Sequence, residues 1–324
     1  MPISVTTVLK LPRSTAECDL LQFAECLAAP QDGSPIVIDM RACAFTIPGA
    51  IVLLLARIHG WVEDGRHVSL QNVETCPALK YLQRMDFFTH CGIGLEETFS
   101  RRDPKRRFVP IQRVERSRSG KIGELSVAVA DCIFPELSNS FDPDKTGLYD
   151  AICYSISEMA LNVVQHSRSD GFAHAQVYPK SGLVRLAIGD YGIGIRKSFE
   201  MAESPHWHPE MNDLDAINTA MQPKVSSRTH LSSGWGGPVN AGVGLTLLSG
   251  LAAVTGGEFC LFSNQGFLRL GHNAIVLPGH VGISGTVCAI TIPQTNIKNF
   301  AVALEQAKRN AGLLGNDTFS GMFS

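Results

Sequence analysis

The sequence predicts an α/β protein built from two domains. Residues 1–98 alternate between short apolar runs and longer stretches of helical periodicity, which predicts a small layer of parallel strands and helices. Residues 148–195 combine an amphipathic helix, two strands and a glycine turn, and 324 residues are enough for two cores. We therefore expect an α/β domain at 1–98, a basic linker at 99–121, a second domain at 122–295 and a C-terminal helix and tail at 296–324. For the second domain we expect an α/β sandwich, in which helices cover one face of a mixed sheet.

The composition is that of an ordinary folded protein, with 44% hydrophobic and 18% charged residues. A net charge of −2 argues against nucleic acid as a partner of the whole chain. Nine cysteines without a Cys-x-x-Cys motif indicate reduced thiols. No apolar run reaches the length of a membrane span, and the N-terminus lacks the basic start of a signal peptide. These observations predict a cytoplasmic protein with no membrane partner.

The N-terminal region is expected to alternate strands with helices. The expected strands are residues 4–11, 35–40 and 67–71, and the expected helices run from a cap at Ser14 to Leu27, from Pro48 to Glu63 and from Cys76 to Phe88. This order, with Ile-Val-Ile-Asp-Met at 36–40 and Gly-Ala-Ile-Val-Leu-Leu-Leu at 49–55, is similar to STAS domains. The resemblance implies that this domain docks a protein partner. The STAS phosphoacceptor serine would fall at 46–49, where Thr46 is the nearby hydroxyl, so phosphorylation and a purely docking role are both open.

Residues 101–121 hold nine of the 28 lysines and arginines of the chain. Such a run of charge is typical of a solvated linker, and binding to nucleic acid or to an acidic surface is the alternative. The apolar stretch that begins at Phe108 marks the start of the second domain in our interpretation. The following stretch, 124–130, fits either a strand or a helix.

A helix with an unusual polar face stands at the centre of the second domain. Apolar residues recur every three or four positions between Asp150 and His166, which predicts an amphipathic helix. Glu158, Asn162 and His166 stand four residues apart, so their side chains project from one face. A carboxylate, a carboxamide and an imidazole in line favour a binding or catalytic site. A solvated polar face with His166 capping the helix end is the alternative.

The strand that follows ends in Asp190, and Gly192 and Gly194 come directly after it. This pattern offers one carboxylate acceptor and a backbone that a ligand can approach closely. A Rossmann dinucleotide site is disfavoured, because Arg196 and Lys197 follow where the third glycine of that motif belongs.

The remainder of the domain contains one long loop, at residues 196–241, in which only the part from Asp213 to Met221 is periodic. Gly242 and Gly244 then open an apolar helix, whose first backbone amides suit phosphate oxygens. The expected elements are strands at 173–178, 183–190, 258–262, 267–270 and 285–292, and helices at 244–255 and 299–309.

The ordered set Glu-x3-Asn-x3-His, Asp-x-Gly-x-Gly and Gly-x-Gly-Leu resembles the GHKL superfamily, the ATPases of the Bergerat fold, over residues 108–293. The resemblance implies that Asn162 holds a Mg²⁺ ion on the phosphates, that Glu158 positions or deprotonates the nucleophile, and that Asp190 accepts from the adenine amino group. It also implies that Thr286 supports Asp190 and that the long loop forms a lid over ATP. The implied site residues are Glu158, Asn162, His166, Asp190, Gly192, Gly194, Gly242, Val243, Gly244, Leu245 and Thr286.

ATP and Mg²⁺ are therefore the expected cofactors, and two functions stay open. In the first, the protein is an ATPase or a serine/threonine kinase of the anti-sigma-factor type, which the presence of Glu158 favours. In the second, ATP only gates a protein-interaction switch, and the STAS-like domain docks the partner. A histidine kinase is disfavoured, because no dimerisation helix with a phosphoacceptor histidine precedes the ATP-binding region. A homodimer is a further open alternative.

Overall fold

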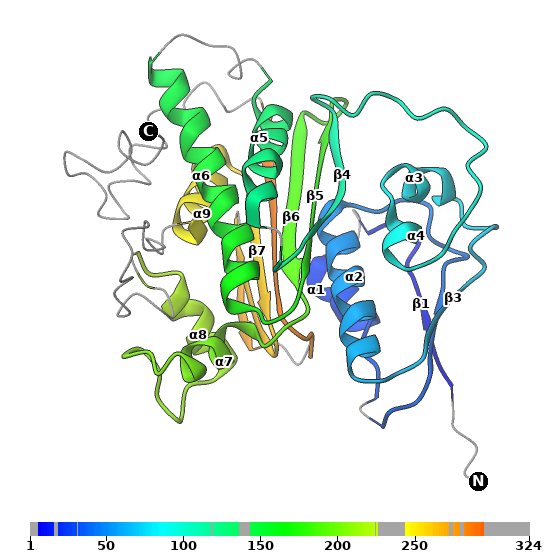
Figure 1. Cartoon of the computed structure of the whole chain (residues 1–324), viewed down its shortest axis with the longest axis horizontal. Helices are drawn as coiled ribbons and strands as arrows, with labels where there is room; N and C mark the ends of the chain where they lie inside the picture. The colour runs from blue at the N-terminus through cyan, green and yellow to red at the C-terminus, as the bar shows by residue number, and fades with distance from the viewer. Residues whose placement is uncertain are drawn as a thin grey trace.

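The computed structural model describes residues 6–15, 19–30, 32–117, 119–135, 143–223, 225, 244–271, 275–278 and 282–294. These residues form a mixed α/β structure with two sheets (Figure 1). A three-stranded sheet belongs to the N-terminal part of the chain, and a seven-stranded sheet belongs to the rest. The α/β fold class expected from the sequence is thus confirmed.

The small sheet has the order β1-β2-β3, with β1 at Thr7–Lys10, β2 at Ile36–Asp39 and β3 at Val68–Gln71. Both strand pairs are parallel, as the sequence predicts. Parallel neighbours require crossover connections, and helices α1 (Leu20–Cys26) and α2 (Pro48–Glu63) lie in these connections. The observed bounds of α2 are those expected from the sequence.

Helix α1 begins later than expected. The side chain of Asp19, rather than that of Ser14, caps it by accepting a hydrogen bond from the backbone N–H of Leu21. Ser14 instead pairs with Phe45 in an isolated bridge.

The single helix expected at residues 76–88 is two short helices, α3 (Leu79–Arg84) and α4 (Phe87–His90). The interruption falls at Asp86, whose φ of 63° is in the left-handed region and cannot continue a right-handed helix. Helical periodicity runs through this point, so the sequence pattern alone did not reveal it.

The large sheet runs in the order β4-β5-β6-β10-β7-β8-β9. Every neighbouring pair in it is antiparallel, so the prediction of a mixed sheet is wrong. Short connections join β5 to β6 and β7 to β8, and such connections suit antiparallel neighbours. The strands are β4 (Phe108–Val114), β5 (Gly171–Tyr178), β6 (Leu183–Asp190), β7 (Glu258–Ser263), β8 (Gly266–Leu270), β9 (Ile275–Pro278) and β10 (Thr286–Pro293). Strand β4 lies inside the basic segment 99–121, so part of that segment is an edge strand of the sheet.

Helices α5 (Ile122–Ile133), α6 (Pro143–His166) and α9 (Gly244–Thr255) lie on one face of the large sheet (Figure 1). They bury apolar side chains such as Ile156 in a core that also contains Ile188 from β6. The stretch 124–130, which fitted either a strand or a helix, belongs to α5 after the short 3₁₀ helix η1 (Ser119–Lys121).

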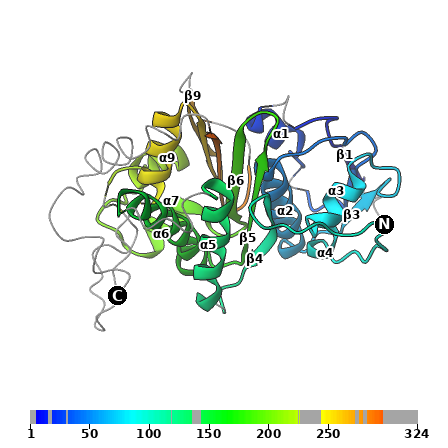
Figure 2. The ribbon, with the colours of Figure 1, turned by 90° about the horizontal axis from the view of Figure 1, so that it is seen from above.

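Helix α2 covers the opposite face of the large sheet (Figures 1 and 2). Its apolar side chains share one core with Phe172 from β5, Ala187 from β6 and Val287 from β10. At the start of α2 a Cβ on Gly49 would lie 3.0 Å from the Cβ of Ala289, so the helix approaches the sheet closely there. Helices α5, α6 and α9 of the second domain lie on one face of the sheet, as expected, and α2 from residues 1–98 covers the other face, which the sequence did not predict. Helix α2 is apolar around most of its circumference because it lies between the two sheets.

Helices α7 (Gly194–Met201) and α8 (Asp213–Ala220) follow the Asp190 turn. Residues 194–201 were expected as turn and loop, and α7 corrects that interpretation, whereas α8 coincides with the periodic stretch. Residues 226–243 and the expected helix at 299–309 lie outside the described residues.

The eight cysteines among the described residues are all free thiols, in agreement with the expectation of reduced cysteines. Within the described residues, none of the helices combines the length and the apolar character needed to cross a bilayer.

Candidate functional site

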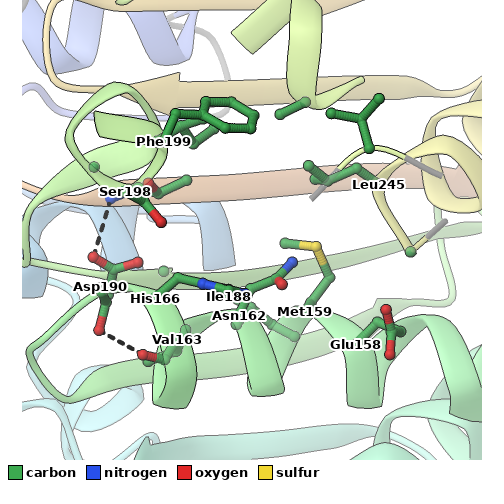
Figure 3. Close-up of a pocket in the computed structure, with 18 residues that line it drawn as sticks. Glu158, Met159, Asn162, Val163, His166, Ile188, Asp190, Ser198, Phe199 and Leu245 are labelled. Atoms are coloured by element: carbon green, nitrogen blue, oxygen red, sulfur yellow. Dashed lines mark hydrogen bonds between the residues drawn. The ribbon is translucent and has the colours of Figure 1, made fainter. Parts of the chain in front are cut away.

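A cleft opens between helix α6, the ends of strands β6 and β10, and helix α7 (Figure 3). Its empty space, open solvent at the mouth included, is about 830 Å³. Most of the site residues expected from the sequence line this cleft. They are Glu158, Asn162, His166, Asp190, Gly194, Gly244, Leu245 and Thr286.

Glu158, Asn162 and His166 lie along the cleft-facing side of α6 (Figure 3). Their spacing of four residues brings them one above the other on the helix. The neighbouring apolar side of the helix buries Ile152 and Ile156 in the core. The helix is therefore anchored by its apolar stripe, and its polar stripe forms a wall of the cleft.

Glu158 is buried, with 5% of its surface exposed. Burial raises the pKa of its carboxyl from 4.5 to about 7, against the lowering effect of a hydrogen bond with the Tyr154 side chain. Gly244, the first residue of α9, packs against it, because a Cβ there would lie 2.7 Å from the Cβ of Glu158. A carboxylate with a pKa near neutrality can take a proton from a nucleophile.

Asp190 ends strand β6 and is also 5% exposed. Its Oδ1 accepts hydrogen bonds from the backbone N–H of Gly192 at 2.9 Å and of Thr286 at 3.3 Å. Burial raises the pKa of its carboxyl from 3.8 to about 7, and these two hydrogen bonds lower it only in part. Within the described part of the chain, no hydrogen bond to Oδ2 is formed. The carboxyl is thus held rigidly through one oxygen, and its second oxygen is available to a ligand.

A glycine is needed at position 192 for a reason that differs from the one suggested by the sequence. It does not line the cleft; a Cβ on it would lie 1.8 Å from the carbonyl oxygen of Ser167, just after α6. The neighbouring Ile193 donates its N–H to the same carbonyl at 2.9 Å. Gly192 therefore allows the Asp190 turn to pack on the end of the helix that carries Glu158 and Asn162.

Gly194 lines the cleft and has a φ of 74°. A Cβ on it would lie 2.4 Å from Nδ2 of Asn264, and this Nδ2 donates to the carbonyl of Ile193 at 3.1 Å. The backbone of Asn264 also bonds to the loop before β10, through Ile283 N–H and Gly285 C=O. Asn264 thus links the Asp190 turn to the loop that carries Thr286, a role that no sequence motif indicated.

Thr286 begins strand β10, and its Oγ1 lies 3.3 Å from Oγ of Ser263. The preceding Gly285 has a φ of 86°, and a Cβ on it would lie 2.6 Å from Oδ1 of Asp190. The Gly-Thr pair therefore combines a glycine that leaves room for the carboxylate with a backbone N–H that donates to it.

Several cleft residues were missed by sequence reasoning. Ser198 and Phe199 of α7 line the cleft opposite α6 (Figure 3), and Ile188 forms part of its floor. One pattern in the sequence could have predicted helix α7. Ile195 and Phe199 are apolar and four residues apart, a spacing that indicates a short helix. Gly242 and Val243, expected at the phosphate end, lie outside the described residues.

The residues present fit a Mg²⁺ ion that arrives with a nucleotide. Among the described residues no group of three His, Cys, Asp or Glu side chains could hold a metal alone. Mg²⁺ does not need such a group, because proteins bind it through one or two oxygens together with waters and substrate phosphates. Asn162 would supply such an oxygen from the cleft wall, one turn from Glu158.

Because the pKa values of Glu158 and Asp190 are raised, we expect these two carboxyls to make the fold less stable as pH rises. Between pH 4 and 7 the native state retains protons on Glu158 and Asp190 that the unfolded chain has released, so the free energy of unfolding falls as pH rises. Each carboxyl contributes a slope of at most about 1.4 kcal/mol per pH unit. We expect Asp190→Asn to gain stability relative to the wild type as pH increases from 5 to 8 in urea unfolding.

The wild type has to be compared with Asp190→Asn because His174 changes the free energy of unfolding with pH in the opposite direction. Burial lowers the pKa of His174 from 6.5 to about 4, so its contribution to stability increases with pH over part of the same range. His174 is present in both proteins, so its contribution cancels when the free energies of unfolding of the wild type and Asp190→Asn are subtracted. A difference that stays constant from pH 5 to 8 would show that the Asp190 pKa is not raised.

No family model, curated protein or solved structure matches this chain.

Proposed function

We propose that the chain binds Mg-ATP in the cleft between α6, β6 and α9, as a protein of the GHKL type with a STAS-like N-terminal layer. The observation that carries the proposal is the convergence of three separate segments on one cleft. Helix α6 contributes Glu158 and Asn162, the end of β6 contributes Asp190, and the start of α9 contributes Gly244. Each has the chemistry that one part of a nucleotide requires.

In this proposal the base lies against Asp190 and the phosphates lie toward the N-terminus of α9. Oδ2 of Asp190 accepts from an exocyclic amino group, since Oδ1 is already engaged by two backbone amides. The first backbone amides of α9 suit anionic oxygens. Asn162, between the two ends of the α6 face, is the protein ligand of Mg²⁺.

Phosphoryl transfer to water or to a serine or threonine hydroxyl is the activity we favour. Such a reaction needs a group that orients the nucleophile and can accept its proton. Glu158 has this chemistry, because its buried carboxyl has a pKa near neutrality and it lies next to the phosphate end of the cleft. The protein is then an ATPase or a protein kinase of the anti-sigma-factor type.

A second candidate is an ATP-gated interaction switch without turnover. It is favoured by the packing of α2 on the sheet that carries Asp190, which connects the N-terminal layer to the cleft. The burial of Thr46 also favours a docking role for this layer. Thr46 is 5% exposed, and its Oγ1 accepts a hydrogen bond from the hydroxyl of Thr15. A hydroxyl buried in this way is a poor phosphoacceptor.

Base selectivity tests the proposed nucleotide site. Asp190 should prefer adenine, because guanine presents a carbonyl oxygen where adenine has an amino group, and two acceptors would face each other. A lost hydrogen bond to a charged group costs about 1.5–3 kcal/mol, or roughly tenfold or more in affinity. We expect calorimetry to show ATP and ADP binding at least about tenfold more tightly than GTP, and Asp190→Asn to lose most of that preference.

The measurement is best made at pH 8, because a protonated carboxyl could donate to guanine, and the pKa of Asp190 is about 7. Asp170→Asn is a suitable control, since Asp170 pairs with Arg113 at 2.8 Å outside the cleft lining. Equal affinity of the wild type for ATP and GTP would exclude the adenine assignment.

A further inference from the structure

The N-terminal layer contacts both segments that hold the Asp190 carboxyl. The His59 ring of α2 stacks on the Tyr191 ring with centroids 5.3 Å apart, and Tyr191 directly follows Asp190. On the next residue of α2, a Cβ at Gly60 would lie 3.3 Å from the Cβ of Ser284. Ser284 belongs to residues 282–285, the loop that leads into Thr286. Helix α2 therefore packs behind both sides of the proposed base site.

Arg57, one turn earlier on α2, makes the polar contact to this loop. One of its guanidinium nitrogens, Nη1, donates to the carbonyl of Gly282, and Nη2 donates to the carbonyl of Leu27 at 3.0 Å. The guanidinium also lies over the Trp61 ring, 4.5 Å from its centroid. Arg57 thereby connects the end of α1 to the start of the loop.

Burial of the charged Arg57 guanidinium costs free energy of folding. The residue is 7% exposed, and among the described residues no carboxylate lies within ion-pair distance of it. Burial accordingly lowers the pKa of its guanidinium to about 10. A well-packed apolar side chain would fill such a position at lower cost if packing were its only purpose. The two carbonyl contacts indicate a positioning purpose instead.

The loop transmits this contact directly to Asp190. Gly285 leaves room for Oδ1 of Asp190, and the N–H of Thr286 donates to that same oxygen. A shift of the loop would lengthen this hydrogen bond and move the carboxyl, because Oδ1 has only one other bond, from Gly192.

We propose that α2, through Arg57 and Gly60, positions the 282–285 loop and thereby sets the orientation of the Asp190 carboxyl, so that the N-terminal layer controls nucleotide affinity. The inference rests on the proposed function in so far as the ligand of Asp190 is an adenine nucleotide. It makes Arg57 a positioning residue for the base site. A partner that shifts α2 would change nucleotide affinity, and the nucleotide would change partner affinity by the same factor.

The test compares Arg57→Lys with Arg66→Lys. Lysine retains the charge but offers one nitrogen in place of two that reach separate carbonyls. Arg66 is a matched control, because it also donates to backbone carbonyls, those of Pro30 and Ser34, but only within the N-terminal layer. We expect Arg57→Lys to weaken ATP binding at least about fivefold in calorimetry. We expect Arg66→Lys to bind ATP like the wild type.

A second readout needs no nucleotide. Amide hydrogen exchange, measured by NMR on the full chain, should be faster at Gly192 and Thr286 in Arg57→Lys and unchanged in Arg66→Lys. If the wild type binds no ATP but this exchange pattern is found, the positioning role holds and the ATP proposal fails. If Arg57→Lys changes neither readout, or Arg66→Lys changes both equally, the positioning role is overturned.

Gly60→Ala provides an independent variant should Arg57→Lys not fold. It keeps Arg57, favours the helical conformation of α2, and places a methyl group against Ser284. Faster exchange at Thr286 without a loss of thermal stability supports the proposal. Exchange at the wild-type rate contradicts it.

Discussion

Replacement of Glu158 by glutamine should slow ATP turnover by about 10²–10⁴-fold while ATP affinity changes little. The amide has the shape of the carboxyl but cannot accept the proton of a nucleophile. The buried position of Glu158 and its pKa of about 7 are the properties of a group that takes up a proton near neutral pH. Single-turnover hydrolysis or phosphoryl transfer, with affinity measured separately by calorimetry, tests this prediction.

The pH dependence of the same reaction gives an independent check. A base acts when it is deprotonated, so wild-type turnover should increase as pH rises through about 7. Glu124→Gln is a matched control, because Glu124 is exposed on α5. Turnover of Glu158→Gln at the wild-type rate would give this residue a structural role and would favour the ATP-gated switch.

Replacement of Asn162 by alanine should abolish Mg²⁺-dependent ATP binding. The ion would lose its protein ligand in the cleft, and the charge of the phosphates would be left without a positioned counterion. We expect the affinity of Asn162→Ala for ATP in the presence of Mg²⁺ to fall to the level measured for the wild type with a chelator. Calorimetry with and without Mg²⁺ makes this comparison.

Gln165→Ala is the matched control for this variant. Gln165 carries the same functional group on the same helix, but it is exposed to solvent. If Asn162→Ala binds Mg-ATP as tightly as Gln165→Ala does, Asn162 is not a metal ligand. The site would then be a nucleotide pocket of a different kind, and the resemblance to GHKL proteins would lose its main support.

The relation between the two parts of the chain matters for any regulatory function. Residues 1–98 were expected to form a separate domain joined by a linker, whereas α2 shares a core with strands β5, β6 and β10. The alternative of an ATP-gated switch therefore has a structural route that does not depend on a flexible linker. Each variant at Arg57 or Gly60 tests that route without replacing a residue that lines the cleft.

Local signals explain why some elements could be predicted from the sequence. The expected bounds of helices α2 and α9 agree with the structure, because Pro48 and Gly244 mark their starts and apolar residues fill their lengths. The alternation in β6 and the spacing of Glu158 and Asn162 are likewise periodic signals within one element. By contrast, α7 escaped prediction because its single apolar pair is too short to show a period.

The sequence by itself determined the α/β class, the polar face of α6 and the presence of a carboxylate at the end of β6, because each depends on neighbours within one turn or one strand. Only the tertiary structure decided the antiparallel direction of the large sheet, the position of α2 on its second face and the contact of Gly192 with Ser167. It also decided the pKa values of Glu158 and Asp190. These properties depend on desolvation and on contacts between residues far apart in the chain, and no local pattern encodes which distant segment will cover a given side chain.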